Sequence, residues 1–212
     1  MRPHNSITLH RSNARRIGLI ADTHVPDRQK SLNPRIIEIL TGTDLILHSG
    51  DISSPEVIEQ LNVIAECIAV QGNNSGDKRN FTPPLARFHL IETANYCRIG
   101  LTHGLYNQWQ RMGDNLIGRS GFVSTGSMRL VRRVAPYFDN ADCIIFGHGH
   151  WPFVHYSEAG TRLYINPGRA FGSRESSCAI LEIGKDLRVR FYPLNNPGRF
   201  RSLTGSWLTF PL

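Results

Sequence analysis

Lysine and long apolar runs are both scarce in this chain of 212 residues. Among 24 basic residues only three are lysines, and 17 acidic residues leave a formal net charge of +7. Arginine grips phosphate through a planar fork, so the composition is compatible with phosphate-bearing partners, although coding bias and a solvated basic surface are the simpler explanation. No apolar run approaches the ~20 residues that cross a bilayer, which excludes a membrane-spanning helix.

Closely spaced cysteines and two common catalytic motifs are also missing. The four cysteines are widely separated and form no C-x-x-C pair, which excludes a disulfide framework and favours small buried residues in a reducing compartment. No apolar stretch near residue 1 resembles a secretory signal, so we expect a cytoplasmic protein. The absence of a Walker loop and of a G-x-S-x-G elbow disfavours nucleoside-triphosphatase and α/β-hydrolase folds.

Short apolar runs alternate with helical segments in the first half of the chain. Strands are expected at 16–22, 44–51 and 66–73, and the two intervening helices start at Asn33-Pro34 and Ser54-Pro55. This β-α-β-α-β order predicts parallel strands joined by helical crossovers. Further strands, a helix and a set of antiparallel strands are expected in the second half, at 86–93, 96–104, 127–138, 142–150, 153–157, 161–166, 177–183 and 187–194.

The whole chain, 1–212, is expected to form a single domain. It carries a basic N-terminal arm at 1–15 and a basic, aromatic C-terminal tail at 194–212, to which the pattern assigns no structure. An insert at 105–140 mixes arginines with aromatic residues, a combination that can stack bases and neutralise phosphates in single-stranded nucleic acid. A helix with aromatic residues in the core and arginines in solvent would give the same pattern.

Residues typical of metal ligands follow one predicted strand after another. The carboxyl ends of parallel strands form a common crevice, and residues two apart on an extended chain point the same way. We therefore expect these side chains to converge. They are Asp22, His24, Asp51, Asn73, His103, His148 and His150.

This set contains too many ligands for one tetrahedral ion. It suits two divalent ions with a bridging carboxylate, for which Asp51 is the candidate. Nitrogen and oxygen donors without sulfur favour manganese first, with iron, zinc, cobalt or nickel as alternatives.

In sequence order the motifs are LIADTH, LILHSGD, VQGN, LTHG, IIFGHGH and YINPG. As a set they resemble the calcineurin-like metallophosphoesterase superfamily, and within it the small YfcE-type phosphodiesterases. The resemblance implies an α/β fold, a four-layer α/β/β/α sandwich of two mixed sheets. It implies one metal bound by Asp22, His24, Asp51 and His150, and another bound by Asp51, Asn73, His103 and His148.

The resemblance also implies an activity, namely hydrolysis of phosphodiesters by attack of a metal-bridging hydroxide. Asp51 and Asn73 would then serve catalysis as ligands of the activating metals. Many members carry a proton-donating histidine directly after the asparagine, where this chain has Asn74. Asparagine cannot act as a general acid at neutral pH, which predicts a preference for leaving groups that need little protonation. Asp77 stands two residues later than the acidic residue of the YfcE-type pattern.

Several alternatives stay open at this point. With the same chemistry the protein could be a nuclease acting on single-stranded nucleic acid through the insert, or it could be a non-catalytic protein-binding scaffold. Arg169 and Arg174 either grip a substrate phosphate or face solvent. His48 either orients a metal ligand or fills the core. The natural substrate and the oligomeric state are not encoded in these motifs.

Overall fold

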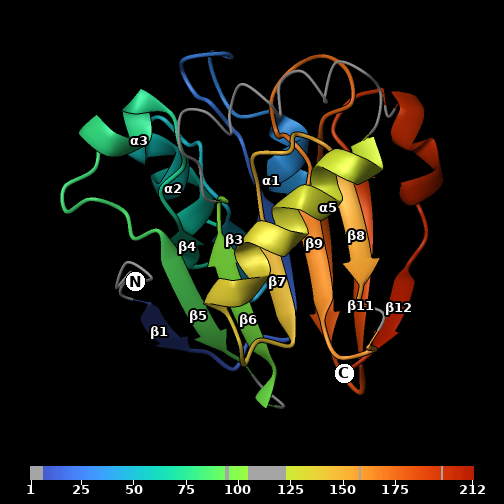
Figure 1. Ribbon diagram of the computed structural model, residues 1–212. Coiled ribbons are helices and arrows are strands. Elements are labelled where there is room, and N and C mark those ends of the chain that lie inside the picture. The colour runs from blue at the N-terminus through green and yellow to red at the C-terminus, as the bar shows by residue number, and fades with distance from the viewer. Residues whose placement is uncertain (1–6, 94–95, 105–122, 158, 197) are drawn as a thin grey trace.

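The computed structural model describes residues 7–93, 96–104, 123–157, 159–196 and 198–212. Two six-stranded mixed sheets lie face to face (Figure 1). The first has the order β1-β5-β6-β7-β9-β8, with β1 (Thr8–Arg11), β5 (Phe88–Glu92), β6 (Arg98–Thr102), β7 (Cys143–Phe146), β9 (Leu163–Pro167) and β8 (Pro152–Tyr156). The second has the order β12-β11-β10-β2-β3-β4, with β12 (Leu208–Pro211), β11 (Asp186–Pro193), β10 (Ser177–Ile183), β2 (Arg16–Ile20), β3 (Leu45–His48) and β4 (Cys67–Ala69).

Three apolar clusters mark the three interfaces between four layers. The cluster between the sheets includes Leu19 and Leu47 from one sheet and Ile145 from the other. A second cluster lies under α1 (Pro34–Leu40) and α2 (Pro55–Asn62). A third lies under α5 (Val123–Val134) and the short helix η2 (Ala135–Tyr137), and Figure 1 shows α5 across the other sheet. The four-layer α/β/β/α sandwich expected from the sequence is confirmed.

The predicted parallel unit is present. β2 pairs in parallel with β3, and β3 with β4. Both connecting helices begin with a proline, whose fixed φ suits the first turn, and Asn33 caps α1 by accepting a hydrogen bond from the Arg35 N–H at 3.0 Å. β2 and β3 are almost wholly buried because helices cover one face of their sheet and the other sheet covers the second.

Four short elements lie where the sequence assigned no structure. β1 falls in the basic arm and pairs in parallel with β5, while β12 and the short helix η3 (Gly198–Leu203) fall in the tail. β12 extends the other sheet by pairing antiparallel with β11. The helix α3 (Ser75–Arg79) follows the third strand of the parallel unit.

The predicted helix in the insert is present as α5 and η2, and residues 105–122 lie outside the described residues. Arg129 and Arg132 on α5 are exposed, whereas Tyr137 stacks on the core residue Phe88 with ring centroids 5.0 Å apart. The described part of the insert thus follows the amphipathic alternative, with the aromatic ring inside and the arginines in solvent. Across the described ranges, no helix is both long and apolar enough to span a membrane.

Candidate metal centre

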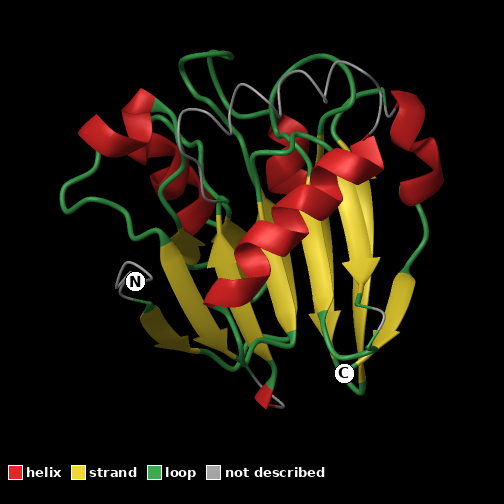
Figure 2. Cartoon of the chain, in the orientation of Figure 1, coloured by secondary structure: helices red, strands yellow, loops and turns green. Residues whose placement is uncertain are grey.

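The residues that directly follow β2, β3, β4, β6 and β7 lie at one end of the two sheets (Figure 2). Backbone hydrogen bonds join the loops after β2 and β3. The Asp22 N–H donates to the Gly50 carbonyl at 2.9 Å, and the His24 N–H donates to the Asp51 carbonyl at 3.0 Å. The loops are therefore fixed to each other before any ligand binds.

Five of the seven expected metal ligands have a left-handed backbone. The φ angles are +51° at Asp22, +47° at His24, +57° at Asp51, +63° at His148 and +59° at His150. The left-handed region costs a non-glycine residue roughly 1 kcal/mol, and such residues gather at functional sites. The expectation that Asp22 and His24 converge from an extended chain is wrong, because both residues have a left-handed backbone and this turn directs the two side chains.

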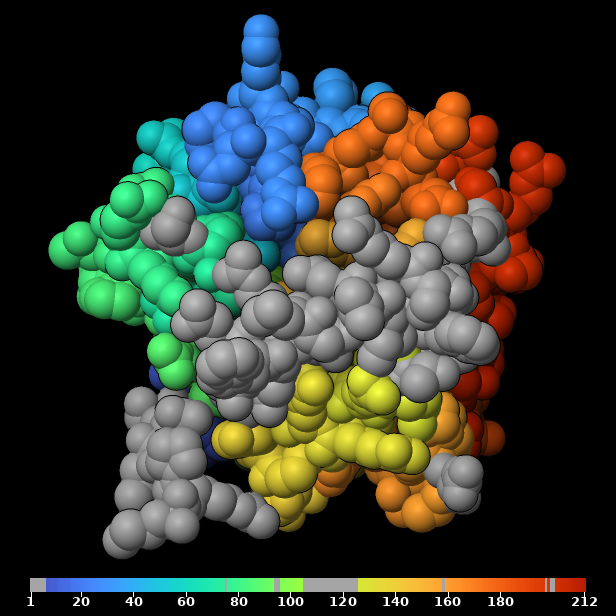
Figure 3. All heavy atoms as spheres, turned by 45° about the horizontal axis from the view of Figure 1, so that its top comes forward, coloured from blue at the N-terminus to red at the C-terminus, as the bar shows by residue number. Residues whose placement is uncertain are grey.

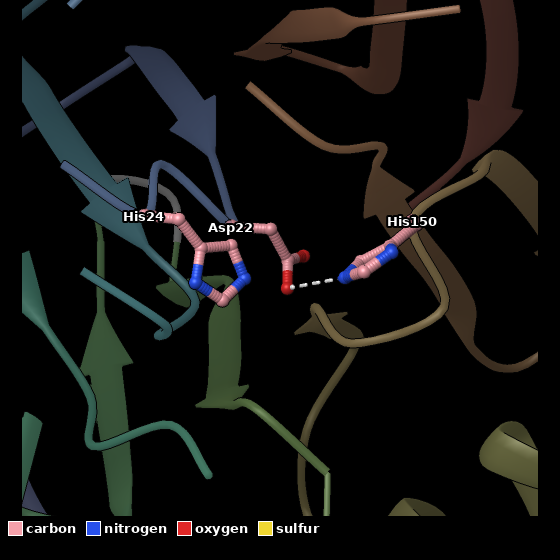
Figure 4. Close-up of side chains that lie close together, drawn as sticks. All are labelled: Asp22, His24 and His150. Atoms are coloured by element: carbon pink, nitrogen blue, oxygen red, sulfur yellow. Dashed lines mark ion pairs between the residues drawn. The ribbon is translucent and has the colours of Figure 1, made fainter. Parts of the chain in front are cut away.

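One cluster of ligands is formed by Asp22, His24 and His150. A carboxylate or imidazole atom of each lies within 4.8 Å of those of the other two. Figure 4 shows the imidazole of His150 facing the Asp22 carboxylate, with His150 Nε2 3.3 Å from Asp22 Oδ1. These three side chains come from the loops after β2 and β7, which are distant in sequence.

A second cluster surrounds Asn73. Its Oδ1 atom lies 2.6 Å from His148 Nδ1 and 2.9 Å from His103 Nε2. His103 Nδ1 lies 2.7 Å from the Ser49 carbonyl, which can only accept, so this nitrogen carries the proton and Nε2 is free to be a ligand. The sequence-predicted partners of the second metal are thus brought together.

Asp51 lies between the two clusters. Its Oδ2 atom is 3.3 Å from His24 Nε2, and its Oδ1 atom is 3.5 Å from His103 Nε2. The Oδ1 atom also accepts hydrogen bonds from the N–H groups of Asn73 and Asn74 at 2.7 and 2.9 Å. One carboxylate oxygen therefore faces each cluster, which is the arrangement that a bridging ligand needs.

The surroundings of three ligands shift their pKa values. Burial opposes ionisation of Asp22, but the charges of the neighbouring histidines, His150 first, prevail and lower the pKa of that carboxyl. Burial lowers the pKa of His24, against the opposing charge of Asp51. Burial also acts to lower the pKa of His103, yet the charges of Asp51 and Asp22 prevail and raise it. Metal ligands must be unprotonated, so Asp22 and His24 are close to their binding form.

Unsatisfied atoms in the clusters show that the residues fit divalent metal ions. Asp22 Oδ1 and His24 Nε2 are buried without a hydrogen bond. Asp22 Oδ1 lies 3.3 Å from His150 Nε2, and His24 Nε2 lies 3.3 Å from Asp51 Oδ2. Buried polar atoms are normally hydrogen-bonded, and a cation satisfies such atoms. The donors are carboxylate, imidazole and amide groups without sulfur, which suits manganese, iron or zinc.

Asp77 supports the site in a way that sequence reasoning missed. Its fully buried carboxylate accepts hydrogen bonds from four backbone N–H groups: those of Asp51 and Gly72 to Oδ2 at 2.9 and 2.7 Å, and those of Ile52 and Ser53 to Oδ1 at 2.8 Å each. Its own N–H donates to the side chain of Asn74, which caps α3. Asp77 stands two residues later than the acidic residue of the YfcE-type pattern, and these two residues belong to the start of α3. The sequence signal for this role was an acidic residue in the first turn of a capped helix.

His48 is fully buried in β3 behind the ligand loops. Its Nδ1 atom accepts a hydrogen bond from the Gly50 N–H at 3.2 Å, which leaves the proton on Nε2, 3.1 Å from Thr23 Oγ1. Burial lowers the pKa of His48 to about 3. A neutral His48 thus connects the loop that carries Asp22 and His24 with the loop that carries Asp51.

The two arginines predicted to grip phosphate differ in position. Arg169 is half-buried, and its guanidinium lies over the Phe171 ring, with 5.2 Å from Cζ to the ring centroid. Phe171 in turn contacts the rings of His24 and His150, at centroid distances of 5.0 and 5.4 Å. Arg174 is exposed, and its carbonyl accepts a hydrogen bond from Arg169 at 3.1 Å. The structure therefore brings Arg169, and not Arg174, to the edge of the ligand cluster.

Two face-to-face mixed sheets, helices on both outer faces, and clustered carboxylates and histidines at the strand ends define a four-layer sandwich with a metal-type site. A family model described as "Calcineurin-like phosphoesterase superfamily domain" matches residues 16–186, and the chain belongs to that superfamily. The family expected from the motifs is thereby confirmed.

Two curated relatives are named probable metallophosphoesterases. The one from Methanothermobacter thermautotrophicus is 32% identical over 152 residues, covering 72% of this chain and 75% of the relative. The one from Methanocaldococcus jannaschii is 31% identical over 182 residues, covering 84% and 81%. Among solved structures, vacuolar protein sorting 29 from Cryptosporidium parvum superposes with a TM-score of 0.68 at 18% identity, covering 94% of this chain and 99% of that one, which shows a shared fold.

Proposed function

We propose that this protein hydrolyses phosphodiesters with the aid of two divalent metal ions, manganese first among the candidates. The observation that carries this proposal is the convergence of all seven expected ligands in two adjoining clusters with Asp51 between them. The superfamily and the names of the relatives support a phosphoester-hydrolysing enzyme.

The proposed reaction adds water across one P–O bond and yields a phosphomonoester and an alcohol. Asp22, His24, Asp51 and His150 would hold one ion, and Asp51, Asn73, His103 and His148 the other. When bound, such a pair supplies Lewis-acid activation of water and of the phosphoryl group. The chain's part is to keep the ligands deprotonated and fixed in place: Asp77 and His48 hold the Asp51 loop, and Thr23 ties the Asp22 loop to His48.

The leaving alkoxide receives no proton from position 74 in this scheme. Asn74 uses its side-chain oxygen to cap α3, and its side-chain nitrogen donates to Ser53 Oγ at 3.2 Å. An amide has no proton to give at neutral pH. The enzyme therefore depends on a stable leaving group or on solvent for that proton.

Metal analysis of the purified protein, followed by a panel of phosphodiesters with and without added Mn²⁺, tests the proposal. We expect close to two ions per chain and hydrolysis that a chelator abolishes and Mn²⁺ restores. Asp51→Asn should lower both metal content and hydrolysis, while Asp139→Asn, at an exposed position after η2, should change neither. An Asp51→Asn protein that binds and hydrolyses like the parent would contradict the bridging role.

Two alternatives share this site and are separated by the same panel. A nuclease would cleave single-stranded DNA or RNA far better than small diesters, and its binding would weaken steeply with salt. A protein-binding scaffold would hydrolyse none of the panel even with two ions bound.

A further inference from the structure

Phe171 forms part of the rim of the first ligand cluster. Its ring meets the His24 and His150 rings edge-on, with interplanar angles of 89° and 88°. The side chain is 9% exposed, so it is packed against these ligands. A group that contacts this ring from outside the cluster is therefore separated from the metal ligands by one aromatic side chain.

Two guanidinium groups lie against that same ring. The Cζ atom of Arg28 is 5.0 Å from the Phe171 centroid, and that of Arg169 is 5.2 Å from it. Arg28 comes from the loop after β2, and Arg169 from the turn after β9.

Hydrogen bonds fix these two loops beside each other. The Gln29 side-chain nitrogen donates to the carbonyls of Thr23 and Ala170, at 3.2 and 3.3 Å. The Ala170 N–H donates to the Ala21 carbonyl at 2.9 Å. In Figure 3 the blue segment after β2 and the orange segment after β9 adjoin on the surface. The spacing of the two guanidiniums is thus set by the fold.

The two arginines retain binding capacity. Arg28 is exposed. Arg169 is half-buried: one terminal nitrogen donates to the Arg174 carbonyl, and its Nε is without a hydrogen bond. In the described ranges neither guanidinium forms an ion pair with a carboxylate, whereas Arg16 and Arg188 both pair with Glu182. A guanidinium that faces solvent beside an anion-processing site is suited to bind phosphate through parallel N–H donors.

We infer that Arg28 and Arg169, seated on Phe171, bind a second phosphate of the substrate, next to the phosphate that is hydrolysed. The preferred substrates are then phosphodiesters that carry a neighbouring phosphate. This inference rests on the proposed function, because it takes the ligand clusters as the place of the scissile phosphate. One ring separates those ligands from the guanidiniums, which places the arginines at the adjacent group rather than at the scissile one.

The test compares the thymidine dinucleotide TpT with the trinucleotide TpTpT. Both contain the same scissile linkage, and each linkage of TpTpT has a neighbouring phosphate on one side. With Mn²⁺ present, we expect kcat/KM for TpTpT to exceed that for TpT by roughly tenfold. A ratio of this size corresponds to the free energy that one charge-assisted hydrogen bond typically contributes. Arg28→Gln should remove most of that preference and leave TpT hydrolysis close to the parent. Arg28→Lys should restore only part of it, and Arg35→Gln, at an exposed position on α1, should keep all of it.

A binding measurement provides a second readout that does not depend on turnover. In metal-free protein, calorimetry should show that thymidine 3′,5′-bisphosphate binds more tightly than thymidine 5′-monophosphate. The Arg28→Gln variant should bind both with the same affinity. An equal loss on TpT and TpTpT would assign the arginines to the scissile phosphate and overturn the inference, as would a preference that survives in both Arg28→Gln and Arg169→Gln. If neither substrate is hydrolysed with two ions bound, the proposed function fails, while the calorimetry still decides on the arginines.

Discussion

At the scale of single residues, Asp77 shows how much of a metal site lies behind its ligands. We expect Asp77→Asn to lower metal affinity by about 10–100-fold, the range typical of groups that orient metal ligands. An amide keeps one acceptor but directs an N–H₂ group at backbone donors, so two of the four N–H groups lose their partner. Titration of the metal-free protein with Mn²⁺ measures the effect, with Asp139→Asn as the control. Unchanged affinity would show that the backbone holds Asp51 without the carboxylate.

Asn74 carries a second prediction at this scale, which concerns the leaving group. A well-placed general acid contributes about 10²–10⁴-fold to the rate, and that contribution grows with the basicity of the leaving group. We therefore expect aryl phosphodiesters to be hydrolysed at least about 100-fold faster than alkyl phosphodiesters in the presence of Mn²⁺. Steady-state rates on a matched aryl and alkyl pair decide the matter, and similar rates on both would mean that another group supplies the proton.

At the scale of elements, the sequence predicted those strands whose apolar runs are buried. β2, β3 and β7 are mostly apolar and almost wholly buried, and all three were expected. β1 and β12 were missed because they are edge strands of four residues each, with no fully buried side chain, which is too short for an apolar run or a sustained alternation to mark them. The turned backbone at Asp22 and His24 was also beyond the sequence, since contacts with the β3 loop impose it.

The site also contains residues that the sequence predicts and residues that it does not. The seven ligands could be named because each follows a recognisable strand. Asp77 could not be assigned a role, because its four partners are backbone N–H groups, which have no signal in the sequence. Three of them lie in the loop after β3, and the fourth, that of Gly72, lies in the loop before α3. Arg28 and Phe171 meet only through the pairing of loops after β2 and β9. Tertiary contacts decided those roles.

The contact between β6 and the helical layer yields a prediction for an element. Gly100 in β6 lies under the Phe138 ring, and an added Cβ would come within 2.6 Å of it. We expect Gly100→Ala to lower the free energy of unfolding by about 1–3 kcal/mol, because Phe138 must move out of a packed core. Gly126 in α5 is the matched control, with no atom within 4 Å of an added Cβ. Gly126→Ala should leave stability unchanged or raise it by up to about 1 kcal/mol. Urea unfolding of both variants compares them, and equal stabilities would contradict the close packing.

At the scale of the whole molecule, His89 joins the two sheets. It lies in β5, and its Nε2 atom is 3.1 Å from the carbonyl of Ala69 in β4 of the other sheet. Because that carbonyl can only accept, Nε2 carries the proton and Nδ1 accepts from His10 Nε2 at 2.9 Å. The arrangement uses a neutral His89. Burial first, and the charge of His10 second, lower the pKa of His89.

This lowered pKa makes stability depend on pH in a defined direction. Below about 6.5, the ordinary pKa of histidine, the unfolded chain binds a proton that the folded chain resists, so stability falls as the pH falls toward the folded pKa.

Other groups contribute to the total, since Asp22, His24 and His48 have lowered pKa values and His103 a raised one. The comparison must therefore be made with His89→Gln, whose amide can still donate to the Ala69 carbonyl but does not titrate. Between pH 6.5 and 5 the parent should lose unfolding free energy faster than the variant, by at most about 1.4 kcal/mol per pH unit for one proton. Urea unfolding of metal-free protein across this range gives both curves. Parallel curves would mean that the link between the sheets persists when His89 is protonated, whereas converging curves locate the acid sensitivity at the β4–β5 contact.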